Sequence, residues 1–178
     1  MIRRCAAFLR RFGRDESGNG TIELVLALPL VFTLFMTSIE LGIHSMRQMW
    51  LERGMDVTVR SIRLGTGNNL DHDALKTMIC DNSGFLPGCH QTLRLEMITV
   101  NPRNFSGFSQ SADCIDVSEP VTPLRQFVHG ASHQLMLLRA CYMFKPVFAL
   151  NGLGRQYTKD GSGRVKMAAV AVFVQEPV

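Results

Sequence analysis

The chain has 178 residues, of which 46% are hydrophobic and 19% are charged, so it can form a packed core and is not expected to be disordered as a whole. Its formal net charge of +4 is concentrated near the N-terminus, where the first 18 residues contain five arginines. The rest of the chain is nearly neutral, which excludes a broad basic surface for nucleic acid. No nucleic-acid partner is therefore expected.

Residues 24–43 form one concentrated apolar segment that only Glu40 interrupts. As a helix this segment would be about 30 Å long, which is the thickness of a bilayer core. The arginines precede it, so the positive-inside rule predicts a cytoplasmic N-terminus and places the chain after Ile43 on the other side of the membrane. No small-residue cleavage site follows the segment, which favours a retained transmembrane helix over a cleaved secretory signal.

Two residues inside this apolar segment need separate interpretation. Pro29 predicts a helix kink, because proline removes one backbone hydrogen bond and neighbouring groups in a membrane can satisfy the freed carbonyl. Glu40 lies near the outer end, where a carboxylate can reach the headgroups at low cost. We therefore expect no special role for Glu40.

Beyond the membrane, apolar residues continue at helical spacing, at Leu51, Met55, Val59 and Ile62. This spacing predicts that the same helix leaves the bilayer and packs on a core until residues 65–69 end it. A cluster of methionines, Met46, Met49 and Met55, is interpreted as part of that core. Asp71 and Asp73 are candidate N-caps of a short second helix that ends at residues 82–84.

Three later segments are predicted to be strands, at residues 92–100, 135–144 and 164–174. The first alternates, with Leu93 on the buried face and Arg94 and Glu96 on a solvent face, whereas the second is apolar on both faces and is expected to be central or well covered. Residues 103–134 are predicted to be loop, held by Phe105 and Phe108, and residues 146–163 a long connection. Together the elements predict an α+β fold with a long N-terminal helix packed on a small antiparallel sheet.

The five cysteines divide between the two sides of the membrane. Cys5 lies in the N-terminal tip, and four others follow the helix, an even number in an oxidising compartment. Three pairings of the four are possible. Cys80 and Cys89 flank a short loop that can bring them together, which leaves Cys114 to pair with Cys141. Free thiols or a metal are the alternatives, but the tight spacing that zinc prefers is missing.

The boundary before the apolar segment has a distinctive spacing, in which Gly18 is followed by four residues and then by Glu23. This layout resembles that of type IV prepilins, in which a membrane-embedded aspartyl peptidase cuts after the glycine and the glutamate becomes the fifth mature residue. The resemblance implies a cut between Gly18 and Asn19. Gly20 stands only three residues before the glutamate and fits the pattern less well.

More specifically, the stretch RDESGNGTIELVLALPLVF resembles the start of TadE-like proteins, the pseudopilins of the tight-adherence (Flp) pilus system. Two further segments resemble the same family: Arg139 with Tyr142 matches its Arg-x-x-Tyr strand, and Phe173 begins a Phe-x-x-Glu-Pro ending. The resemblance is best over residues 14–65 and 135–177. The related TadF and TadG proteins share the N-terminal pattern, and chain length favours the TadE or TadF type over TadG.

The resemblance implies a pilin-like organisation in three parts: a leader at residues 1–18, a transmembrane helix at 19–43 and an extracytoplasmic domain at 44–178. It implies a single-pass protein of the bacterial inner membrane with a periplasmic domain that helps to initiate or cap a pilus and becomes part of it. Glu23 would pair with the new N-terminus of a neighbouring subunit. The implied partners are the prepilin peptidase, a second pseudopilin, the Flp major pilin, the inner-membrane assembly platform and membrane lipid.

Two other classes of function are the alternatives. Glu23 could be an ordinary interfacial charge, in which case the chain would be a single-pass anchored domain that binds an extracytoplasmic ligand. An anchored hydrolase is the less favoured alternative. His129 and His133 have the spacing of two helical metal ligands, but Gly130 stands where a metalloprotease needs glutamate. We expect no enzymatic activity, no cofactor and no metal.

Overall fold

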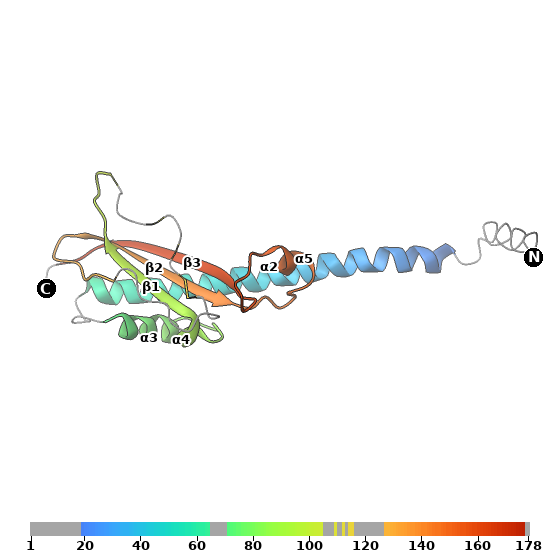
Figure 1. Ribbon diagram of the computed structural model, residues 1–178, viewed down its shortest axis with the longest axis horizontal. Helices are drawn as coiled ribbons and strands as arrows, with labels where there is room; N and C mark the ends of the chain where they lie inside the picture. The colour runs from blue at the N-terminus through green and yellow to red at the C-terminus, as the bar shows by residue number, and fades with distance from the viewer. Residues whose placement is uncertain are drawn as a thin grey trace, which may run out of the picture.

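The computed structural model describes residues 19–64, 71–104, 109, 112, 114–115 and 127–176. These residues form an α+β fold in which one long helix carries a small antiparallel sheet, as the sequence predicts (Figure 1). The elements in chain order are α2 (Asn19–Arg63), α3 (His72–Asn82), α4 (Cys89–Thr92), β1 (Leu93–Thr99), β2 (Leu135–Phe144), α5 (Gly152–Gln156) and β3 (Val165–Val174).

Helix α2 has 45 residues and two different halves. Its C-terminal half lies along the sheet, whereas its N-terminal half extends away from the folded domain without any covering element (Figure 1). The apolar residues of that bare half are exposed, and α2 is the one helix among the described residues that is long and apolar enough to cross a membrane. Pro29 lies inside α2, which continues on both sides of it.

The sheet has the strand order β1-β2-β3, and both pairs are antiparallel. Strand β2 is central, as its apolar character on both faces predicts, because it pairs with β1 on one side and with β3 on the other. Ala140 of β2 lies between Leu95 of β1 and Ala169 of β3, which defines the register of all three strands.

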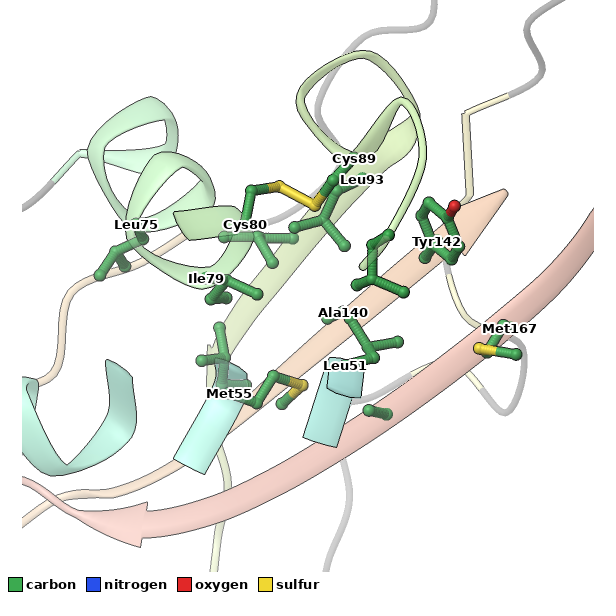
Figure 2. Packing of buried hydrophobic residues seen from close by; sticks show 14 of the residues in the cluster. Leu51, Met55, Leu75, Ile79, Cys80, Cys89, Leu93, Ala140, Tyr142 and Met167 are labelled. Carbon is green, nitrogen blue, oxygen red and sulfur yellow. A yellow bond between two sulfur atoms is a disulfide. The ribbon is translucent and has the colours of Figure 1, made fainter. Parts of the chain in front are cut away.

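The core lies between the C-terminal half of α2, helix α3 and one face of the sheet (Figure 2). Leu51 and Met55 of the predicted stripe are fully buried, and Val59 and Ile62 pack against the same core at its margin. The three methionines do not act as one group. Met55 is in the core, but Met46 and Met49 are largely exposed, because their positions on α2 turn away from α3 and the sheet.

Helices α2 and α3 cross at close range at Gly54, where the absence of a side chain is required. A Cβ atom at this position would lie 2.6 Å from the carbonyl oxygen of Ile79 and would also overlap the Ser83 hydroxyl. The Ser83 backbone amide and side chain both donate to that same carbonyl, which closes the end of α3. At its start, Asp71 is the N-cap, and its carboxylate accepts a hydrogen bond from the Ala74 amide at 2.8 Å.

The expectation that β1 is a half-buried strand is wrong. Arg94 and Glu96, placed on a solvent face by the alternation, are both buried at 5% exposure or less. On the outer face of the sheet, β1 and β2 are buried, whereas the outward side chains of β3 are exposed. Ser109 accepts a hydrogen bond from Arg139 there, and Cys114 is bonded to Cys141 of β2. The alternation of residues within one strand does not show whether residues from elsewhere in the chain bury its outer face.

Two short helices were not predicted. Helix α4 follows the loop after α3, and α5 lies inside the segment that the sequence predicts to be a plain connection. The predicted loop anchors Phe105 and Phe108 lie outside the described residues, as do residues 65–69, which were expected to end the long helix.

Candidate functional site

The expected processing site is only partly described. Gly18 lies outside the described residues, and Asn19 is the first described residue, already within α2. Glu23 lies one helical turn further along and is exposed to the surroundings of the bare helix. No other residue of the described part of the chain forms an ion pair with its carboxylate.

Three hydroxyl side chains in the N-terminal half of α2 make hydrogen bonds within the helix itself. The hydroxyl groups of Thr33, Thr37 and Ser38 each donate to the carbonyl oxygen four residues earlier, at 2.7–2.9 Å. The acceptor of Thr33 is the carbonyl of Pro29. This pattern suits a helix in lipid, where no water is available to satisfy polar groups.

Glu40 does not reach the headgroups, and the expectation that it has no special role is wrong. Its side chain is buried with 1% exposure. One carboxylate oxygen accepts a hydrogen bond from the Phe148 amide at 2.9 Å, and both oxygens accept from the Val147 amide, at 3.0 and 3.2 Å. Glu40 therefore attaches the segment after β2 to α2 by charge-assisted hydrogen bonds.

The same segment contacts α2 at several other levels. The carbonyl of Lys145 accepts a hydrogen bond from Arg47, and Tyr157 stacks on the His44 ring with 5.7 Å between the ring centroids. Burial, and secondarily the charge of Glu40, raises the pKa of the Tyr157 hydroxyl. Arg47 and His44 follow the predicted end of the transmembrane segment at residue 43, whereas Glu40 lies inside that segment.

Of these contacts, the one made by Gly152 lies nearest the N-terminus of α2. Gly152 begins α5 with a φ of 52°, and a Cβ atom at this position would lie 2.5 Å from the hydroxyl oxygen of Thr37. A left-handed conformation and a close approach both favour glycine there. The contacts between the segment after β2 and helix α2 therefore reach Thr37, inside the stretch that the sequence assigns to the transmembrane helix.

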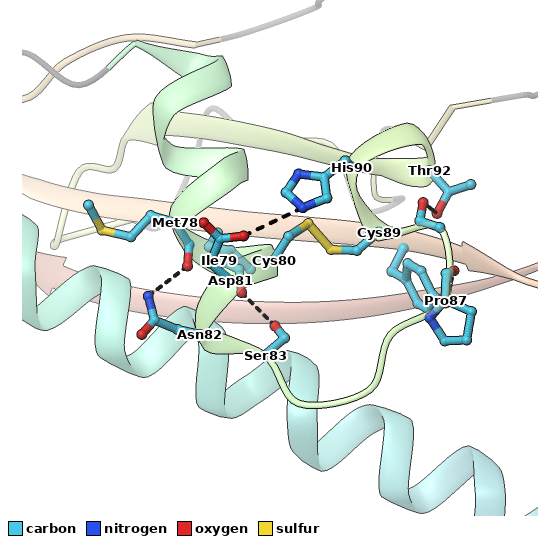
Figure 3. Close-up of a disulfide and its surroundings, with 12 residues drawn as sticks. Met78, Ile79, Cys80, Asp81, Asn82, Ser83, Pro87, Cys89, His90 and Thr92 are labelled. Carbon is cyan, nitrogen blue, oxygen red and sulfur yellow. Dashed lines mark hydrogen bonds and ion pairs between the residues drawn. A yellow bond between two sulfur atoms is a disulfide. The ribbon is translucent and has the colours of Figure 1, made fainter.

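Two disulfides are present, and they join the pairs that the sequence favours. Cys80 at the end of α3 is bonded to Cys89 at the start of α4, with their Cα atoms 5.8 Å apart (Figure 3). Cys114 is bonded to Cys141 on the outer face of β2. The first disulfide closes the turn between the two helices, and the second joins Cys114 to the central strand.

Arg139 and Tyr142, the pair that resembles the family's Arg-x-x-Tyr strand, lie on opposite faces of β2 and both have structural partners. The Tyr142 hydroxyl donates to the carbonyl of Pro87 at 2.7 Å, and burial raises its pKa. Arg139 lies 3.3 Å from the Glu96 carboxylate in a buried ion pair. The motif therefore connects the central strand to the α3–α4 loop on one face and to β1 on the other.

The arrangement of the histidines does not fit the helical metal site that their spacing suggests. Residues 128–134 are loop, so His129 and His133 do not share a helix face, and His133 has a φ of 65°. Within the described ranges, no three histidine, cysteine or acidic residues gather as a metal site would require.

The geometry defines an α+β domain carried on a long N-terminal helix whose first half is suited to a membrane. Residues 18–60 match the model of a family described as TadE-like protein. The match includes Gly18, Glu23 and Pro29, and it confirms the predicted resemblance for this segment. No curated protein and no solved structure matches the chain significantly.

Sequence reasoning missed Glu40 as a site residue. The signal was an acidic residue within an otherwise apolar segment, which requires either water or buried donors. Its position near the end of the segment made water the simpler expectation. The donors come from residues more than 100 positions later in the chain, so no local pattern identifies them.

Proposed function

We propose that the chain is a pseudopilin of the tight-adherence (Flp) pilus system, of the TadE or TadF type, with no enzymatic activity of its own. The observation that carries this proposal is the TadE-like match over residues 18–60, because it covers both the peptidase spacing and the apolar helix. A prepilin peptidase removes residues 1–18 at the cytoplasmic face. The mature protein remains in the inner membrane with its domain in the periplasm.

The architecture of α2 supports this proposal physically. Its bare half has exposed apolar residues, which suit lipid before assembly and the helices of other subunits after it. Its other half is packed into the core, so the domain has to move together with the helix. A protein of this kind can join a second pseudopilin on the assembly platform and initiate or cap a fibre of Flp major pilins.

Cleavage after Gly18 is the first prediction of the proposal. Co-expression with the cognate prepilin peptidase is expected to yield a chain that starts at Asn19. The variant Gly18→Val is expected to remain full length, because a branched side chain does not suit the narrow site expected of this peptidase class. Intact mass and N-terminal sequencing of membrane-derived protein measure both results.

Gly20→Val is the matched control, because a Cβ atom at Gly20 meets nothing within 4 Å and this glycine does not have the required spacing to Glu23. The control is expected to be cut normally. A wild-type chain that still begins at Met1 beside an active peptidase would contradict the proposal and would favour the anchored ligand-binding domain.

Pairing of Glu23 with a neighbouring subunit is the second prediction. Cleavage creates an ammonium group on Asn19 near the bilayer interface, and low polarity there strengthens its attraction to a carboxylate. Glu23→Ala is therefore expected to be processed and inserted normally, to lose co-purification with the second pseudopilin and to produce few or no pili. Complementation of a deletion strain, with processing scored by mass and pili by microscopy, is the measurement.

The control for this prediction is Glu52→Ala, which removes an exposed glutamate from the same helix. Glu40 cannot serve as the control, because its carboxylate is buried and holds the segment after β2. Normal piliation with Glu23→Ala would reduce this residue to an ordinary interfacial charge. Equal defects in Glu23→Ala and Glu52→Ala would also contradict a specific role.

A further inference from the structure

The segment at residues 145–159 exposes apolar side chains at the end of the domain that faces the bare half of α2. Leu150 is 82% exposed and Val147 is 52% exposed. Figure 1 shows α5 beside α2 at the point where the sheet has ended and the uncovered helix begins. The exposed apolar surface of this segment is therefore adjacent to the exposed apolar surface of the helix.

The segment is held in place by partly buried hydrogen bonds and a close packing contact. Glu40 accepts hydrogen bonds from the amides of Val147 and Phe148, and Lys159 donates from Nζ to the carbonyl of Ala149 at 2.8 Å. Gly152 contacts Thr37 closely. These contacts fix the height of Leu150 along the axis of α2.

The position of Leu150 along the axis of α2 coincides with the expected surface of a bilayer. Residues 19–36 are the part of α2 that precedes the Thr37 contact. As a helix they extend about 27 Å, which is close to the roughly 30 Å of a bilayer core. When this stretch spans the membrane, Thr37 lies at the outer interface. The segment beside it then lies at the level of the headgroups.

The charges of the segment suit phospholipid headgroups. Residues 145–159 include three basic residues, Lys145, Arg155 and Lys159, and no acidic residue. Lys145 and Arg155 are exposed. Basic side chains around a few exposed apolar ones are the composition of segments that lie in a membrane interface.

We propose that residues 145–159 form a second membrane contact, in which Leu150 and Val147 enter the interface of the same bilayer that α2 spans. The inference rests on the proposed membrane anchoring. Two contacts to one membrane, one through the helix and one beside it, restrict the tilt of the domain. They hold the sheet in a defined orientation on the membrane surface, which a single helix does not do.

Environment-sensitive labelling of single cysteines tests this contact in the full-length chain with Cys5 replaced by serine and both disulfides intact. Leu150→Cys and Val147→Cys carry the NBD fluorophore in vesicles of phosphatidylethanolamine and phosphatidylglycerol. Val128→Cys is the matched control, because Val128 has the same 52% exposure as Val147 but lies beside Met97 of β1. Leu30→Cys, in the bare helix, reports insertion of α2.

Labels at residues 150 and 147 are expected to emit at shorter wavelength than the label at 128. Interfacial segments enter about 5–10 Å into the boundary between headgroups and acyl chains. A spin label near the top of the acyl chains is therefore expected to quench the residue 150 label at least about twofold more than the residue 128 label. If residue 30 is in lipid and residues 150 and 147 are in water, the interfacial contact is refuted and the anchoring stands. If residue 30 is also in water, the anchoring itself fails.

A third result would also overturn the inference. If the label at residue 150 is shielded only at high protein-to-lipid ratio and is not quenched by spin-labelled lipid, a second copy of the chain covers the segment instead of the membrane.

Discussion

Glu40→Ala is expected to release the segment after β2 from helix α2. The carboxylate is the acceptor for the amides of Val147 and Phe148, and both donors would lose this partner at a partly buried position. The loss amounts to about 2–3 kcal/mol, because the cost of two unsatisfied donors is partly offset by removal of a buried charge. This corresponds to about 30- to 150-fold more frequent opening of the segment.

Hydrogen exchange measures this opening directly in the full chain in detergent. The amides of Val147 and Phe148 are expected to exchange faster in Glu40→Ala, whereas those of the central strand β2 keep their protection. Glu40→Gln is expected to show a smaller effect, because its amide oxygen can still accept one of the hydrogen bonds. Glu52→Ala, at an exposed glutamate of the same helix, is expected to leave exchange unchanged.

Exchange at residues 147 and 148 within about twofold of the unaltered chain would contradict the role of Glu40, since even one lost hydrogen bond to a charged group exceeds that effect. Uniformly faster exchange across the sheet would show that Glu40 supports the whole domain and not this segment alone.

Arg139→Met is expected to have the largest effect on the free energy of unfolding. The side chains of Arg139 and Glu96 are each only 7% exposed, and the Ser109 carbonyl accepts a second hydrogen bond from the guanidinium. Removal of the arginine leaves a buried carboxylate without its countercharge, which costs about 3–5 kcal/mol. Replacement of both partners, Arg139→Met with Glu96→Leu, is expected to restore most of the stability, because neither charge of this pair is then left buried without its partner.

Urea unfolding of the full chain in mild detergent, followed by the fluorescence of Trp50, measures this effect. Trp50 is the only tryptophan and packs against the Phe85 ring at 6.2 Å between centroids, so its emission reports the α2–α3 side of the domain. The matched control is Arg63→Met, which breaks the half-exposed pair with Glu176 and is expected to cost less than about 1 kcal/mol. Equal costs for Arg139→Met and Arg63→Met would contradict the burial argument.

The sequence by itself determined the elements whose patterns are local. The strand predicted at residues 135–144 agrees with β2, and the other two agree with β1 and β3 within a residue at each end. The Asp71 cap and the Leu51 and Met55 stripe also follow from neighbours within a few turns. The TadE-like match at residues 18–60 belongs to this group as well, because it occupies one continuous segment.

Only the tertiary structure decided which surfaces are covered. Alternation placed Glu96 in solvent, but it is buried and pairs with Arg139, whose guanidinium also donates to the Ser109 carbonyl. Hydropathy placed Glu40 at the headgroups, but its carboxylate is buried and accepts hydrogen bonds from amides more than 100 residues later in the chain. The physical reason is the same in both cases. The sequence around a charged side chain looks the same whether water or distant buried groups bind that side chain. Only the packing of the folded chain brings those distant groups to it.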